Sequence, residues 1–210
     1  MSTNDISDEE NEADMQEPSE EGLVNMKIVK MLKVLVEEQY IAMALLADGL
    51  LHCQQYLLSS SSPLTRRVGL ELLSALCHDS SPAGDYTYVP DIIDEFKLTV
   101  VQMLDDSRAL IRALALQWLG GIMVYRHPNG ENLARYQPGI DFVTESVDED
   151  KLFAMLKGTR DEAKVAAEIV KLTARYSTQP EVRDSMNMSK ELIDLLWNGV
   201  FWDEEKVSLR

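Results

Sequence analysis

The sequence predicts an all-α protein, in which a short solenoid of helical hairpins follows a disordered acidic head. Three observations predict this class. From Leu23 onward, apolar residues recur at three- and four-residue steps, which is the period of an amphipathic helix. No stretch alternates apolar and polar residues convincingly, as a half-buried strand does. One helical hairpin is also repeated, with an offset of 46 residues between Arg66 and Arg112.

The acidic head is expected over residues 1–22. Residues 1–21 contain nine acids and no lysine or arginine, and so supply more than half of the formal charge of −16. Such a segment cannot bury enough apolar surface to offset the entropy lost on ordering, so we expect it to be disordered. Ser7 precedes three acidic residues and is a candidate phosphosite. We expect the head to contact a basic surface on a partner or to block one.

The helical domain is expected over residues 23–207. Pro, Gly and Ser mark loops at 59–63 and 79–90, and a longer non-helical excursion at 127–147. The expected helices are Leu23–Glu37, Gln39–Leu58, Leu64–His78, Asp91 to about Leu104, a helix ending near Arg126, Asp148–Lys157, Asp161–Tyr176, Pro180–Asn187 and Ser189–Trp202.

The repeat covers a loop as well as a helix. The 46-residue shift aligns Arg66 with Arg112 and Gly69 with Ala115 without a gap. A looser third copy, shifted by 52 residues, aligns Lys164 with Arg112. Two amphipathic helices align easily by chance, but agreement in the loop, the basic position and the small residue together is harder to obtain by accident. Two unrelated hairpins in a helical bundle are the alternative interpretation.

The repeated residues resemble the HEAT/armadillo family, whose two-helix units of about 40–47 residues stack into solenoids. In that family, the second helix follows a turn aspartate and carries an aliphatic–arginine pair, then a small residue and a leucine. This sequence supplies Asp106, the pair Ile111–Arg112, Ala115 and Leu119.

The resemblance implies a ladder of charged contacts between neighbouring hairpins. Its members would be Arg66, Asp106, Arg112 and Lys164, with each cation bonding turn groups of its own repeat or of the next one. A partly buried arginine is tolerated when it is paired and costly when it is not. The first copy has serines where Asp105 and Asp106 stand, so the ladder is expected to be incomplete at that end.

The carboxy-terminal segment "LLWNGVFWDEEK" places Trp197, Phe201 and Trp202 on nearly one helical face. Exposed aromatic residues of this kind dominate interface energetics, which makes them candidate partner-binding residues. Covering the core of the last repeat is the alternative role.

No catalytic arrangement stands out. The pairs His52–Cys53 and Cys77–His78 contain zinc-ligand types, but adjacent residues on a helix point about 100° apart and rarely converge. Acidic pairs fall at helix starts, where they suit the helix dipole. The sequence contains no phosphate-binding glycine-rich loop. We therefore expect a protein that is not an enzyme and has no cofactor or bound metal.

These features favour a non-catalytic adaptor or scaffold that binds protein partners as a subunit of a larger complex. The alternatives are a chromosome-organising factor of the condensin HEAT type, a small metal-binding protein or enzyme that uses Cys and His, and a self-associating structural protein. Two cysteines and no signal peptide predict an intracellular protein, nuclear or cytoplasmic. The apolar runs are too short to span a membrane. A pI near 4.5 argues against direct nucleic-acid binding.

Overall fold

The computed structural model describes residues 20–36, 38–77, 88–129, 132–187 and 189. Within them the chain is helical apart from one short β-hairpin, so the predicted all-α class is confirmed in its main feature. The helices are α2 (Glu20–Val36), α3 (Gln39–Ala47), α4 (Leu50–Ser59), α5 (Pro63–Leu76), α6 (Val89–Gln102), the 3₁₀ turn η1 (Met103–Asp105), α7 (Ala109–Val124), α8 (Gln137–Ser146), α9 (Glu149–Leu156) and α10 (Arg160–Tyr176).

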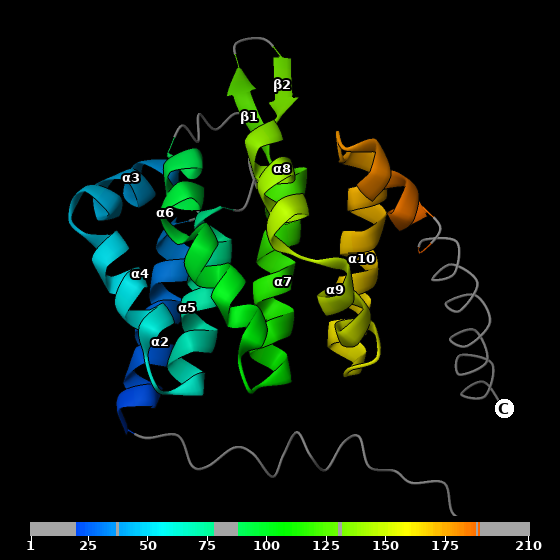
Figure 1. Cartoon of the computed structure of the whole chain (residues 1–210). Coiled ribbons are helices and arrows are strands. Elements are labelled where there is room, and N and C mark those ends of the chain that lie inside the picture. The colour runs from blue at the N-terminus through cyan, green and yellow to red at the C-terminus, as the bar shows by residue number, and fades with distance from the viewer. Residues whose placement is uncertain (1–19, 37, 78–87, 130–131, 188, 190–210) are drawn as a thin grey trace, which may run out of the picture.

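The longer helices pack side by side in chain order. Helix α5 lies between α2 and α7, and α7 lies between α5 and α10. Helices α4, α6 and α9 each pack against the longer helix that follows them in the sequence. Each of α5, α7 and α10 is therefore the second helix of a hairpin, and these second helices form one continuous layer (Figure 1).

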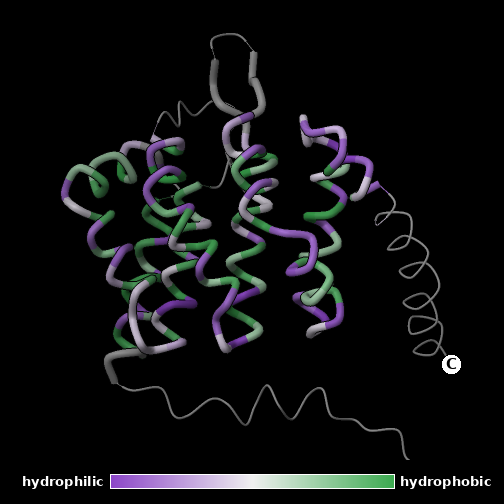
Figure 2. Tube along the Cα trace, viewed as in Figure 1, coloured by the Kyte–Doolittle hydropathy of each residue, from purple (hydrophilic) through white to green (hydrophobic). Residues whose placement is uncertain are grey.

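One apolar core runs through this layer. The second helices contribute fully buried side chains along their length, such as Leu73 on α5, Leu119 on α7 and Val170 on α10. In Figure 2 the hydrophobic positions recur along every helix of the array, as expected when each helix buries one face against a neighbour.

Local sequence signals explain where the second helices begin. The hydroxyl of Ser62 caps α5 by accepting a hydrogen bond from the Thr65 N–H, and Pro63 occupies the first turn, where no backbone donor is needed. Thr159 and Glu162 form a reciprocal capping box at the start of α10.

The helix predicted over Gln39–Leu58 is wrong in one respect, because it is broken in two. Gly49 adopts φ = +100° between α3 and α4, a conformation that other residues rarely adopt. The two halves are bent by 77° relative to each other.

The prediction that residues 127–147 form a long non-helical excursion is wrong in part, because a β-hairpin and helix α8 lie in this range. The strands β1 (Arg126–Asn129) and β2 (Asn132–Arg135) pair antiparallel, with Asn129 opposite Asn132. The hairpin projects above the array in Figure 1. Helix α8 then begins around Pro138, which favours a helix start although it interrupts a helix interior.

Candidate functional site

Arg66 on α5 joins two successive hairpins. Its Nη1 donates to the carbonyl oxygens of Ser60 at 2.8 Å and Ser61 at 2.9 Å, in the turn before its own helix. Its Nε lies 2.8 Å from Oδ2 of Asp106, in the turn before α7. The two side chains are only 16% and 9% exposed, so this pair is more shielded from water than an ordinary surface salt bridge.

Arg112 on α7 repeats this arrangement. Its Nη1 donates to the carbonyl oxygens of Asp106 at 2.8 Å and Ser107 at 3.1 Å. Each arginine thus reaches carbonyls five and six residues before itself, and the 46-residue offset relates the turns as well as the arginines. The Nε of Arg112 lies 2.7 Å from Oε1 of Glu162 on α10.

The acid at the second interface is a buried helix residue rather than a turn residue. The Glu162 side chain is 2% exposed. Its second oxygen accepts from the backbone N–H of Thr159 at 2.9 Å and lies 3.0 Å from the Thr159 hydroxyl. Burial alone would raise the pKa of Glu162, but the hydrogen bonds from Arg112 and Thr159 lower it below its ordinary value of 4.5. Glu162 is therefore ionised at neutral pH and is not available as a proton donor.

Asp106 connects the two interfaces. Its side chain accepts from Arg66 and from the backbone N–H of Arg108, while its own carbonyl oxygen accepts from Arg112. One polar chain therefore runs from the turn before α5, through both arginines, to the start of α10. We call Arg66, Asp106, Arg112 and Glu162 the charged ladder.

Two further ion pairs join neighbouring hairpins outside the ladder. Lys151 on α9 lies 2.8 Å from the carboxylate of Asp105, whose side chain is 70% exposed. Lys33 on α2 lies 3.2 Å from Glu71 on α5. Burial acts to raise the pKa of Glu71, yet the hydrogen bonds from Lys33 and Arg67 hold that pKa below its ordinary value.

Lys164 does not take the place predicted from the third copy. It is exposed on α10, and within the described residues it forms no ion pair with Glu162, which binds Arg112. The helix starts give the reason. The N-cap residues Arg108 of α7 and Thr159 of α10 are 51 positions apart, so Ala163 is the equivalent of Arg112, and Lys164 lies about 100° further around α10. Sequence reasoning missed Glu162, although the pattern Thr159-x-x-Glu162 is the signature of a capping box.

The small residue of the repeat permits close packing. A Cβ placed on Gly69 would lie 2.9 Å from Leu57 Cβ on α4, nearer than such atoms approach. The Gly69 carbonyl oxygen also accepts from the buried amide of Gln54 at 2.7 Å. Glycine at this position therefore sets how closely α4 approaches α5.

The cysteines and histidines do not converge within the described part of the chain. His52 and Cys53 are exposed on α4, and Cys77 follows α5. Burial raises the pKa of the Cys77 thiol to about 12, and the nearby Trp118 indole opposes this shift only in part. The described residues contain no group of three or more His, Cys, Asp or Glu placed to hold a metal ion.

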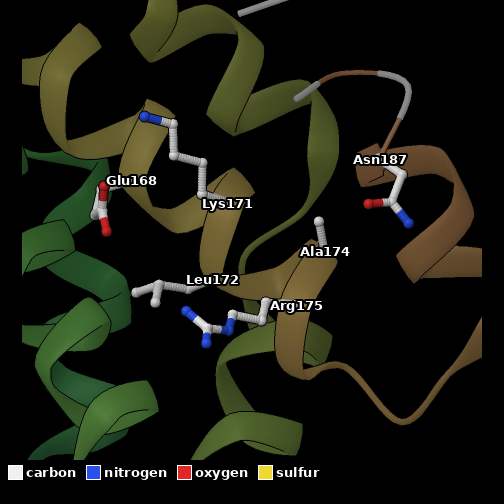
Figure 3. A pocket seen from close by; sticks show the side chains of 6 residues that line it. All are labelled: Glu168, Lys171, Leu172, Ala174, Arg175 and Asn187. Atoms are coloured by element: carbon white, nitrogen blue, oxygen red, sulfur yellow. The ribbon is translucent and has the colours of Figure 1, made fainter. Parts of the chain in front are cut away.

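A groove of about 540 Å³ with a mixed polar and apolar lining lies between α10 and the helical residues 180–187. Five residues of α10 line it on one side and Asn187 on the other (Figure 3). Its lining carries charges of both signs, from Glu168, Lys171 and Arg175. It contains no ladder residue.

Several predicted site residues lie outside the described residues. These are the candidate phosphosite Ser7, residues 1–19 of the acidic head, and the aromatic residues Trp197, Phe201 and Trp202. Residues 20–22, assigned to the head, instead form the beginning of α2.

In the described part of the chain, no single helix has both the length and the apolar composition of a membrane span. Only Tyr40–Ala47 and Leu50–Ser59 taken together meet those criteria, and that pair is sharply bent. No protein-family model matches the chain, and no curated protein is similar to it in sequence.

Proposed function

We propose that this protein is a non-catalytic adaptor or scaffold, built as a short HEAT-like solenoid that presents a helical surface to protein partners in a larger intracellular complex. One observation carries the proposal. Arg66 and Arg112, 46 residues apart, make the same contacts to their own turns and each bind an acid of the next hairpin.

This recurrence supports a stacked array because each ion pair joins two hairpins and could not form within an isolated one. A repeat unit that cannot bury its apolar face alone gains stability from its neighbours. In the charged ladder, two partly buried arginines form such contacts between neighbouring hairpins. Extended arrays of this kind offer long surfaces to partner proteins.

The ionised state of Glu162 supports a structural role. Glu162 and Asp106 each bind an arginine, and the pKa of Glu162 is lowered rather than raised toward neutrality as in a general acid. We therefore assign the most buried carboxylate of the ladder to holding hairpins together. Partner contacts then fall to other surfaces, with Trp197, Phe201 and Trp202 as the first candidates.

Native size in a cell extract tests the proposal. The untagged chain at its natural abundance is expected to elute with a mass well above that of a dimer, and affinity purification is expected to recover the same partners in stoichiometric amounts. A variant carrying Trp197→Ala, Phe201→Ala and Trp202→Ala is expected to lose a partner while keeping its helical circular dichroism.

Elution of the intact chain at the mass of a monomer or homodimer would contradict the adaptor role. Leu98→Ala is the matched control, because Leu98 is 64% exposed on α6 and lies far from the aromatic segment in sequence. Its partners are expected to be those of the unaltered chain.

A further inference from the structure

The outward side of α2 carries an uncovered apolar stripe. Val24, Ile28, Met31 and Leu35 are spaced four, three and four residues apart, which places them along one face of the helix. They are 53%, 49%, 67% and 39% exposed. The opposite face is occupied by the array, because α2 packs on α5 and buries Val29 and Val36.

The other end of the layer looks different. Every exposed position of α10 is charged, namely Arg160, Asp161, Lys164, Glu168 and Arg175. The exposed positions among residues 23–36 are six apolar residues and two lysines, Lys27 and Lys30. Terminal units of a repeat array need a polar outer face to stay soluble alone. The exposed positions of α10 are polar although the helical residues 180–187 lie beside it, whereas those of α2 are mostly apolar, so α2 is suited to be covered.

We infer that a second copy of this chain covers the stripe, with the two α2 helices packed antiparallel about a two-fold axis. The spacing 4–3–4 reads the same in both directions. In an antiparallel pair, Val24 therefore faces Leu35 of the partner copy, and Ile28 faces Met31. Each layer combines a β-branched side chain with one that is not branched at Cβ, and such self-complementary contacts are the basis of two-fold dimers.

Charge permits this pairing. Residues 23–36 contain three lysines and no acid, in a chain of net charge −16. Lys33 is engaged with Glu71, while Lys27 and Lys30 are exposed beside the stripe. Two acidic molecules can therefore meet over residues 23–36 without bringing carboxylates together there, because Glu20 and Glu21 of α2 lie beyond the end of the stripe. Screening by salt reduces the remaining repulsion between the copies, so the dimer is expected to tighten as salt rises.

Two segments of the same chain are poorer occupants. Residues 1–19 offer acids to the lysines but lack apolar residues at three- and four-residue steps. The apolar run that starts at Leu192 comes three residues after Ser189, a reach of about 10 Å. Helices α2 and α10 are separated by α5 and α7, and neighbouring helices lie about 8–10 Å apart, so the start of that run cannot reach α2 of its own molecule.

The mass of the full chain in solution tests the inference. A single helix face offers less than the roughly 800 Å² per partner of a standard interface, so we expect a dissociation constant in the micromolar range. Sedimentation from about 1 to 200 µM is expected to show a transition from 23.7 kDa to twice that mass.

Substitutions locate the interface. Met31→Lys is expected to weaken dimerisation by at least about tenfold because it places a charge against Ile28 of the partner copy. Leu98→Lys, at an equally exposed leucine on α6, is expected to leave the dissociation constant unchanged. Thermal unfolding of each variant checks that the monomer is intact.

A mixing experiment tests the antiparallel register. Ile28→Glu and Met31→Lys are each expected to be monomeric alone, whereas an equimolar mixture is expected to form a heterodimer through the new Glu–Lys pair, with Met31 on Ile28 in the other layer.

A monomer at every concentration would overturn the inference, as would an association that Met31→Lys leaves intact. Masses that increase beyond the dimer with concentration would overturn the two-fold pairing, because they indicate that the stripe binds a different surface of the next copy. Dissociation on adding salt would also overturn it, because it indicates that an acidic segment binds the lysines beside the stripe. Failure of the mixture to associate would overturn the register. None of these outcomes depends on whether other proteins bind the chain, so the adaptor proposal is tested separately.

Discussion

The two rungs of the charged ladder share a cation and a turn but differ in their acid. Arg66 and Arg112 reach equivalent carbonyl oxygens. Arg66 then binds Asp106, a turn residue whose side chain is 9% exposed, whereas Arg112 binds Glu162, which is 2% exposed and buried in a helix cap. The repeated element is therefore the contact of each arginine with its own turn. The acid of the next hairpin is not repeated, because it comes from a turn in one case and from the first turn of a helix in the other.

This difference has an energetic consequence. A carboxylate left without its cation in a turn can be hydrated, but one buried under a helix cap cannot. We expect the α7–α10 interface to depend more strongly on its ion pair than the α5–α7 interface does.

Arg112→Ala is expected to produce the largest loss, about 3 kcal/mol of unfolding free energy, because it leaves the Glu162 carboxylate buried with only Thr159 as a donor. Urea denaturation followed by circular dichroism measures this. Lys30→Ala, at an exposed lysine of α2, is the control and should change stability by less than about 0.5 kcal/mol. Equal losses in the two variants would be incompatible with the ladder.

Arg66→Ala is expected to cost about 1–2 kcal/mol, because Asp106 keeps the Arg108 N–H as a donor and water can enter the turn where the Arg66 side chain lay, while two turn carbonyls lose their donor. The same denaturation experiment ranks the two arginines. A larger loss for Arg66 than for Arg112 would reverse the comparison between the interfaces.

Acid is expected to weaken the α7–α10 interface. The pKa of Glu162 is lower in the folded chain than its ordinary value of 4.5, so the unfolded chain binds more protons as the pH falls. Its contribution is present above the ordinary pKa of 4.5 and is lost as the pH falls through the lowered folded-state pKa. Urea midpoints between pH 7 and pH 3 should decline less steeply for Glu162→Gln than for the unaltered chain. Parallel curves would show that Glu162 is not the responsible group.

Lys164→Ala is expected to have the smallest effect, less than about 0.5 kcal/mol, because this side chain is exposed on α10. A loss comparable to that of Arg112→Ala would mean that the third copy carries a cationic rung after all.

The sequence was informative where a repeat constrained it. The all-α class, the two arginines and Asp106 follow from the periodicity and from one ungapped alignment. Glu162 did not follow, because the alignment compares only positions that repeat between hairpins. This acid belongs to the capping box of α10, which the other two hairpins do not share. The β-hairpin was missed because its strands are four residues long and contain Pro128, so they lack an alternating pattern.

The ends of the array were least predictable. The exposed stripe of α2 has the same helical period as a core-facing stripe, and α2 carries apolar residues on both sides. Only the packing of α5 shows which side is buried. Likewise, a single glycine within a helical pattern does not by itself indicate a helix end. The left-handed conformation of Gly49, which separates α3 from α4, was therefore not evident from the sequence.

A pair of double-mutant cycles tests the ladder most directly. Unfolding free energies would be measured for Arg112→Ala, Glu162→Gln and the double variant, and likewise for Arg66→Ala, Asp106→Asn and their double variant. We predict coupling of about 1.5 kcal/mol or more at Arg112–Glu162 and a smaller, still favourable value at Arg66–Asp106. Coupling indistinguishable from zero at both interfaces would contradict it.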